Sequence, residues 1–594
     1  MTLLRSVLSL LERRERLQLG VLAAGLVIMG LLEMVGVASI LPFMRLVADP
    51  GVLERSGWLA DLHARLGSPE PGRFLFQAGL FLLGIIALNN LFNAVTSWYL
   101  FRFAWAQNHR LSLRLLSRYL GQPYAFFLDR NTSELSQKLL QEVNSVVSGV
   151  LLPMLQVAAR GVSVVLLVVL LAVVDLRMAL LVALIFGGSY GLVYLLLRRR
   201  QYHLGVERFT QNTARFSVSR EVLVGIKDVK SLGREAEFLR RFAEPSWRYS
   251  LGTAQNQIVG RLPRYALETI AFGTVIVIIL ARLRQGGDFA TLLPVLSVYV
   301  FAGYRLMPAL NELFSSVVTM RFNTAALDRL LDDLSGPDPD EGLRPEARGE
   351  IAFRESIELD GVQFRYPDTR GFALRDVDLR IEANQVVGFV GTTGSGKTTL
   401  VDLLLGLLAP TEGSLRVDGV PLDARTRLAW RRHCGYVPQD VFLSDDTITA
   451  NIAFGLPPAE VDPAAVERAA RIAQLHDFVQ ELPDGYATVV GERGIRLSGG
   501  QRQRIGIARA LYHDPDVLVL DEATSALDGA TEAAVLDTIH TLAHTKTLLV
   551  IAHRLTTVRP CDVIHVVEAG RVVASGSWDD LVASSERFQA LGGR

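Results

Sequence analysis

The sequence predicts an α-helical membrane domain fused to an α/β domain. Two observations support this fold class. The chain of 594 residues is 50% hydrophobic, its mean hydropathy is +0.28, and its apolar residues concentrate before about residue 318. The later part instead has short apolar runs of strand length, one of which leads into a glycine-rich loop. We therefore expect a membrane domain over residues 1–331, a linker over 332–350 and a soluble domain over 351–594.

Six segments of the first domain are long and apolar enough to cross a membrane, since a spanning helix needs about 20 mostly apolar residues. They cover residues 17–43, 74–100, 146–174, 178–197, 265–283 and 289–314. Basic residues concentrate before the first segment, after the second, and between the fourth and fifth. By the positive-inside rule, both termini and the two long loops face the cytosol.

The loop between the first two segments has a pattern of its own. Over residues 52–66, leucines and Trp58 fall near one helical face, and charged side chains lie elsewhere. This pattern predicts an amphipathic helix, which either lies on the outer membrane surface or packs on neighbouring spans.

Charged side chains within the predicted spans are candidate contacts for a transported molecule. An ionisable group at mid-membrane costs about 2.5–3.5 kcal/mol on insertion scales, so such groups usually face a protein interior or a wet cavity. Glu33, Arg160, Glu268 and Arg305 lie in or near these spans. Arg264 and Glu268 are four residues apart and can pair along one helix face. Arg305 has no acidic neighbour one turn away, so we select Arg305, Arg264 and Glu33 as substrate candidates.

The α/β domain carries a phosphate-binding loop between an apolar run, residues 386–390, and a helix expected to begin near Lys397. Glycines let backbone N–H groups turn toward phosphates, and a helix N-terminus favours anions. We expect Lys397 to reach the β- and γ-phosphates of ATP and the Thr398 hydroxyl to ligate Mg²⁺. The predicted nucleotide contacts are Gly391, Thr392, Thr393, Gly394, Ser395, Gly396, Lys397, Thr398 and Thr399.

Two more apolar runs deliver polar residues at their ends. Residues 517–520 are followed by Asp521, which fits a Mg²⁺ ligand acting through water, and by Glu522, which fits a general base. Residues 548–551 lead to His553, for which we expect a contact to the γ-phosphate.

These residues resemble the ABC transporter family over the whole chain. Residues 436–439 read Tyr-Val-Pro-Gln and match the family's Q-loop. The resemblance implies that Gln439 ligates Mg²⁺ and takes part in catalysis. It also implies that Tyr366 stacks on adenine, with Phe364 as a near neighbour that could substitute for it.

Two further motifs imply a site shared by two chains. Residues 497–501 match the family signature, and residues 525–528 match its D-loop. By resemblance, the signature binds the γ-phosphate of ATP held by the opposite subunit. The residues implied are Ser498, Gly499, Gly500, Gln501 and, in the D-loop, Asp528.

Six spans followed by one ATPase domain resemble a half-transporter of the type IV exporter fold. The resemblance implies short coupling helices near residues 124–134 and 223–232. Because Lys397, Glu522, His553 and the signature are all intact, we expect a homodimer rather than a heterodimer with one degenerate site. The balance of 61 Lys+Arg and 61 Asp+Glu gives no reason to expect a nucleic acid partner.

Three local runs resemble the flippases of lipid-linked oligosaccharides. They are Glu33 with residues 40–44, residues 263–268 and residues 304–308. A polyprenyl-pyrophosphate head is anionic, and Arg264 or Arg305 could pair with it. We expect ATP-driven flipping of a lipid-linked glycan from the inner to the outer leaflet of a bacterial plasma membrane. The alternatives are a lipid or multidrug exporter, or a nucleotide-gated channel or regulator on the same fold.

Overall fold

The computed structural model divides the chain into two compact units. We call Met1–Arg118 with Arg130–Pro337 the helical unit, and Tyr119–Asp129 with Asp338–Arg594 the α/β unit. The structure describes residues 3–48, 71–174, 176–284, 289–335, 351–367, 369, 371–522, 542–552 and 554–592.

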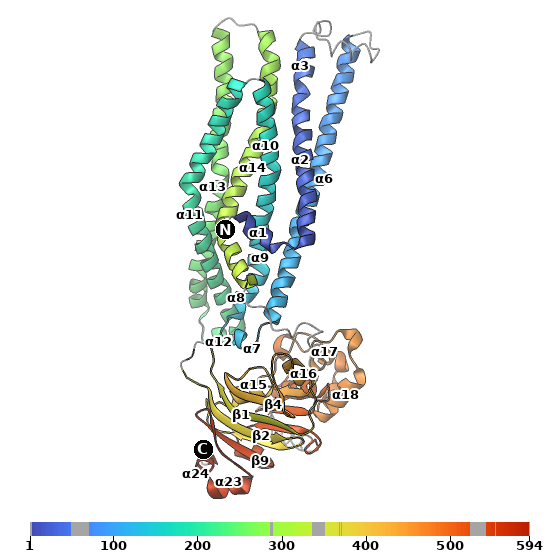
Figure 1. The fold of residues 1–594 in the computed structure, drawn as a ribbon, viewed down its shortest axis with the longest axis vertical. Coiled ribbons are helices and arrows are strands. Elements are labelled where there is room, and N and C mark those ends of the chain that lie inside the picture. Colours follow the sequence, from blue (N-terminus) through green and yellow to red (C-terminus); the bar gives the residue numbers. More distant parts are fainter. Residues whose placement is uncertain are drawn as a thin grey trace. The chain divides into compact units, whose positions relative to one another are not determined.

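Long helices running alongside one another build the helical unit, and short helices join or extend them (Figure 1). Long and short helices together are α1 (Leu3–Leu10), α2 (Arg13–Ala38), α3 (Ile40–Ala48), α6 (Pro71–Leu120), α8 (Thr132–Gln137), η1 (Lys138–Glu142), α9 (Val143–Val146), η2 (Val147–Leu151), α10 (Leu152–Val174), α11 (Leu176–Val224), α12 (Ile226–Ser231), α13 (Glu235–Arg284) and α14 (Phe289–Ser335).

Three helical stretches among the described residues are long and apolar enough to cross a membrane: Arg13–Met44, Gly72–Leu120 and Thr132–Val174. They contain the first three predicted spans. The other three predicted spans fall on α11, α13 and α14, which have 49, 50 and 47 residues. At 1.5 Å per residue, helices of this length measure roughly 70–75 Å, well beyond the ~30 Å hydrocarbon core of a bilayer. Each therefore has length to spare for an extension into water.

Close helix packing explains two glycines of this unit. A Cβ atom at Gly205 of α11 would lie 1.9 Å from the carbonyl oxygen of Phe322 on α14. A Cβ atom at Gly149 would lie 2.4 Å from Cγ of Asn323. Gly149 belongs to η2, one of two π-helical stretches, so the start of the third predicted span is not regular α-helix.

Three expectations concern shorter segments: the linker, the amphipathic helix and the coupling helices. Helix α14 continues to Ser335, so the first four residues of the predicted linker are helical, and residues 336–350 lie outside the described part of the chain. The predicted amphipathic helix over residues 52–66 also lies outside it. Short helices occur at both predicted coupling segments, as α7 (Tyr124–Leu128) with α8, and as α12.

The α/β unit contains two sheets. A four-stranded antiparallel sheet has the order β2-β1-β4-β5, and a six-stranded sheet has the order β10-β9-β3-β8-β7-β6. The strands are β1 (Ser356–Phe364), β2 (Leu374–Glu382), β3 (Val386–Val390), β4 (Glu412–Val417), β5 (Val420–Pro421), β6 (Cys434–Val437), β7 (Val517–Asp521), β8 (Thr547–Ile551), β9 (Val563–Glu568) and β10 (Arg571–Gly576).

Helices cover both faces of the six-stranded sheet. They are α15 (Lys397–Leu404), α16 (Arg427–Arg431), α17 (Ile448–Ile452), η5 (Pro458–Glu460), α18 (Pro463–Ile472), α19 (His476–Glu481), η6 (Gly485–Ala487), η7 (Glu492–Gly494), α20 (Gly499–Leu511), α22 (Leu555–Val558), α23 (Trp578–Ser584) and α24 (Glu586–Gly592). Strands β3, β7 and β8 are buried at every residue, as expected for parallel strands with both faces covered.

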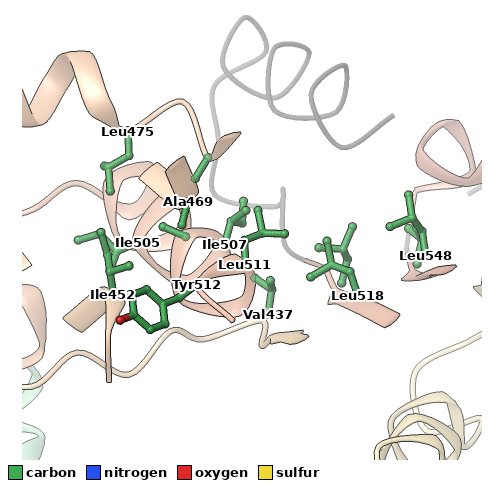
Figure 2. Packing of buried hydrophobic residues seen from close by; sticks show 14 of the residues in the cluster. Val437, Ile452, Ala469, Leu475, Ile505, Ile507, Leu511, Tyr512, Leu518 and Leu548 are labelled. Atoms are coloured by element: carbon green, nitrogen blue, oxygen red, sulfur yellow. The ribbon is translucent and has the colours of Figure 1, made fainter. Parts of the chain in front are cut away.

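Two hydrophobic cores lie on the two faces of that sheet. Leu400 and Leu404 of α15 share one core with Val519 of β7. On the other face, apolar residues of α17, α18 and α20 belong to one core with Leu518 and Leu548 of the strands (Figure 2). Because β6, β7, β8 and β3 are mutually parallel, their carboxyl ends meet at one edge, where open α/β sheets bind ligands.

The two cysteines of the chain, Cys434 and Cys561, both lie in the α/β unit. Both are free, Cys561 is buried and Cys434 is partly buried. Burial, followed by the nearby Asp562 carboxylate, raises the pKa of Cys561 to about 12.

Candidate nucleotide site and charged pairs between helices

The phosphate-binding loop follows β3 and ends at the first turn of α15. Gly391 approaches β9 so closely that a Cβ atom there would lie 2.1 Å from the carbonyl oxygen of Val567. Gly396 begins α15 in the left-handed region, with φ of 107°. Glycine is therefore required at two positions of the loop for different reasons. Gly391 lies too close to β9 for a side chain, and Gly396 has a backbone conformation that a side chain disfavours.

Lys397 folds back over the loop that precedes it. Its Nζ donates to the carbonyl oxygens of Gly391 at 2.8 Å and Thr392 at 3.0 Å. Burial lowers the pKa of Lys397, and the carboxylates of Glu522 and Asp521 oppose that shift. The ammonium group is thus held at the mouth of the loop with two carboxylates nearby.

Polar atoms around the loop fit an oxygen-rich anion and Mg²⁺. The Ser395 hydroxyl oxygen is buried and has no hydrogen-bond partner among the described residues. Thr398, Gln439 and Asp521 supply oxygen atoms, the ligand type that Mg²⁺ prefers. No group of three His, Cys, Asp or Glu side chains in the described part could hold a metal alone. Mg²⁺ is usually bound by one or two carboxylates plus substrate phosphates.

Glu522 and Gln439 meet directly at the sheet edge. Gln439 Nε2 donates to Glu522 Oε2 at 2.8 Å, and Gln503 Nε2 donates to the Glu522 carbonyl oxygen at 3.3 Å. The backbone N–H of Glu522 donates to Ile551 O at 3.1 Å. Glu522 has φ of 49°, a left-handed conformation that costs about 1–2 kcal/mol for a residue with a side chain. These hydrogen bonds hold the strained residue, and strain of this kind clusters at functional sites.

The signature run is the N-terminus of α20. Ser498 is the N-cap residue, and its Oγ accepts from the Gln501 N–H at 3.2 Å. The Gln501 side chain returns the contact by accepting from the Ser498 N–H at 2.8 Å. Ser-x-x-Gln is a capping-box sequence, so this run by itself predicts the start of a helix. Gly499 and Gly500 are the first two residues of α20 and have no side chain at that end of the helix.

Tyr366 lies beside the start of α15. Its hydroxyl shares a 2.9 Å hydrogen bond with the Thr399 hydroxyl, and its ring packs edge-on against Phe364. Phe364 is 5% exposed and belongs to the core, so it does not replace Tyr366 as the candidate for adenine stacking. His553 and Asp528 lie outside the described residues, so their roles remain predictions.

The structure pairs every charged residue that was singled out in the predicted spans. Arg264 Nε lies 2.6 Å from Glu268 Oε1, which confirms that these neighbours pair. Arg160 Nε lies 2.6 Å from Glu312 Oε2, joining α10 to α14. Arg305 of α14 lies 3.7 Å from Glu33 of α2, which is only 5% exposed. The sequence missed the last two pairs because their members are far apart along the chain.

Known proteins show the same two-part organisation. Family models described as ABC transporter and ABC transporter transmembrane region match residues 374–525 and 73–313. A protein of Cupriavidus metallidurans named ATP-dependent lipid A-core flippase is 34% identical over 525 residues, 87% of this chain and 86% of the relative. The chain belongs to the ABC transporter family. It is an ABC half-transporter whose ATPase domain couples ATP hydrolysis to transport.

Other similar proteins support the exporter fold of this ABC transporter. A relative of the same name from Alkalilimnicola ehrlichii is 33% identical over 488 residues, 80% of each chain. The solved structure of a bacterial Atm1-family ABC exporter with ATP bound is 26% identical, with a TM-score of 0.78 over 97% of this chain and 98% of that one.

Proposed function

We propose that this ABC transporter is a lipid flippase that works as a homodimer in the bacterial plasma membrane, with the α/β unit in the cytosol. The cargo is an amphiphile with an anionic glycan head, moved from the inner to the outer leaflet. The names of the relatives support lipid as the class of cargo. The paired arginines between the helices support an anionic head.

The observation that carries the anionic head is the Arg160–Glu312 pair. Its side chains are 33% and 34% exposed, so this pair is partly open while it joins two helices. A guanidinium has five N–H donors, and one ion pair occupies only one or two of them. Arg160 and Arg305 can therefore receive a phosphate while each keeps its glutamate partner. An uncharged cargo would give these two arginines no comparable partner.

The α/β unit supplies the energy through a site shared by two chains. Lys397 and Ser395 of one protomer would hold the phosphates from one side, and Ser498 of the partner subunit would approach the γ-phosphate from the other. Glu522 would take the proton of the attacking water, with Gln439 holding its carboxylate. When bound to Thr398, Gln439 and Asp521, Mg²⁺ would neutralise charge on the phosphates. Closure shifts the helices only as far as ATP binds the closed form more tightly.

Two cargoes of this class are supported by different observations. The runs around Glu33, Arg264 and Arg305 resemble flippases of lipid-linked oligosaccharides, which favours a polyprenyl-pyrophosphate glycan. The relatives named lipid A-core flippase favour lipid A-core. The shared chemistry is a lipid anchor with a polar glycan head.

Reconstitution into liposomes tests the proposal. Vesicles would contain a fluorescent polyprenyl-pyrophosphate glycan, fluorescent lipid A-core or a fluorescent uncharged glycolipid, with the Glu522→Gln variant as the inactive control. We expect ATP-dependent flipping of one of the first two and none of the third. Equal transport of the uncharged glycolipid would contradict an anionic head, and ATPase stimulated by drugs alone would favour a multidrug exporter.

Mixed dimers test the two-chain site. Lys397→Ala damages the loop and Ser498→Arg damages the signature, so each homodimer lacks both sites. A heterodimer of the two variants keeps one intact site if the nucleotide lies between loop and opposite signature. We expect the mixture, purified with two different tags, to regain ATPase that neither variant has alone. No recovery would contradict the shared site.

A further inference from the structure

Polar side chains gather around the proposed metal carboxylate Asp521. We call Tyr366, Asp402, Tyr436 and Asp521 the tyrosine–aspartate cluster. Asp402 is 7% exposed and Asp521 is 8% exposed, while Tyr366 and Tyr436 are partly buried. The roles proposed so far use only Asp521 and Tyr366 of this group, so Asp402 and Tyr436 need a separate explanation.

Strand register brings Tyr436 to Asp521. Strands β6 and β7 are parallel, and Tyr436 aligns with Val519. Side chains alternate between faces along a strand, so Val519 and Asp521 share one face with Tyr436. The Tyr436 hydroxyl donates to Asp521 Oδ2 at 3.4 Å, the long end of hydrogen-bonding range.

Asp402 approaches the same carboxylate from α15. Val519 shares a core with Leu400 and Leu404, which places α15 over this face of the sheet. Asp402 lies three residues after Thr399 on the helix, and Thr399 holds the Tyr366 hydroxyl. Burial and then the charge of Asp521 raise the pKa of Asp402 to about 6. Burial and then the charges of Asp521 and Asp402 raise the pKa of Tyr436.

We propose that Tyr436 is a positioning residue for the metal carboxylate Asp521. The proposal rests on the assignment of Asp521 as a Mg²⁺ ligand. Partners of metal ligands orient the ligand, and their loss typically reduces metal affinity about 10-fold or more. Tyr436 reaches Asp521 from the neighbouring strand β6.

The test measures metal affinity without turnover. The full chain carrying Glu522→Gln is saturated with ATP, and Mn²⁺ binding is followed by electron paramagnetic resonance; ATP affinity is also measured without metal. We expect Tyr436→Phe to raise the Kd for Mn²⁺ about 10-fold and to leave metal-free ATP affinity unchanged. Tyr512→Phe, which removes the hydroxyl that accepts from the Asp462 N–H, is the matched control and should change neither.

An unchanged Kd in Tyr436→Phe, or an equal loss of metal-free ATP affinity, would overturn the positioning role. If Asp521→Asn itself leaves Mn²⁺ binding intact, the underlying metal assignment fails instead.

Discussion

The two units hold their polar groups in different ways. In the α/β unit, Asp521 and Glu522 stand at the end of one buried strand, and Gln439 follows a neighbouring strand. In the helical unit, Arg160 and Arg305 find their carboxylates on other helices. Parallel strands bring their carboxyl ends to the same edge of a sheet, so residues that follow them lie close together. Charges on long helices pair only where the helices pack against one another. Local motifs therefore specify the motor, whereas packing specifies the charge pairs of the helical unit.

The largest effect should come from substituting Glu522, the proposed general base at the end of β7. Glu522→Gln should lower ATPase turnover at least ~100-fold, because a general base contributes about 10²–10⁴-fold, while ATP binding persists. Steady-state phosphate release and equilibrium binding of a fluorescent ATP analogue measure the two effects. Glu412→Gln at the exposed start of β4 is the control. Near-normal turnover would contradict the assignment.

A second substitution tests the ion pair that helix packing forms between Arg305 and Glu33 in the helical unit. Arg305→Ala leaves the buried Glu33 carboxylate without its cation and should lower stability by about 3–4 kcal/mol, within the range for breaking a buried pair. The Glu33→Gln/Arg305→Gln variant should recover most of that loss. Heating in detergent followed by size-exclusion chromatography measures it.

The double variant also separates structure from transport. If Arg305 binds the cargo, Glu33→Gln/Arg305→Gln should be stable and still flip poorly while retaining basal ATPase. Arg248→Ala is the matched control, because its pair with Glu244 is 51% and 64% exposed and should matter by less than about 1 kcal/mol. Normal flipping by the stable double variant would remove Arg305 from the cargo site.

A buried histidine should make the α/β unit sensitive to acid. His565 of β9 is 5% exposed, stacks on Phe389 and lies 2.7 Å from the Ser575 hydroxyl. Burial lowers the pKa of His565 to about 4. Between pH 6.5 and 4 the unfolded chain takes up a proton that the folded chain excludes, so stability falls as pH falls, by up to about 3 kcal/mol.

Calorimetry of the full chain at pH 5 and pH 7.5 measures this effect. His565→Gln has no titrating ring, so the difference in melting temperature between the two pH values should shrink. An unchanged pH difference in His565→Gln would show that other groups cause it.

The smallest effect should appear at the signature helix. Ser498→Ala removes the N-cap of α20 and should destabilise its first turn by about 1 kcal/mol. Faster hydrogen exchange at Gly500 and Gln501 would report this fraying. Ser577→Ala removes an equivalent capping box on α23 and should fray that helix without changing ATPase. A signature change that alters ATPase but not exchange would point to lost contact rather than lost capping.

Sequence reasoning located most of the nucleotide site. The strand, loop and helix around Lys397 follow one another without interruption, and Asp521 directly ends an apolar run, so local order was sufficient. It could not locate Tyr436 as a partner of Asp521, because that contact depends on strand register. It recognised the Arg264–Glu268 pair, which lies one turn apart, and missed Arg160–Glu312, which joins two helices.

By itself, the sequence determined that the chain has a long apolar half, an ATPase half and an intact set of nucleotide motifs. The length of an apolar segment and the spacing of glycines are local properties of the sequence. Bilayer thickness explains the first, and phosphate binding by backbone N–H groups explains the second. Only the tertiary structure decided which carboxylate neutralises each arginine, how Glu522 is held at positive φ and what lies behind Asp521. Those contacts join residues distant in sequence, and their geometry exists only after the helices and strands have packed.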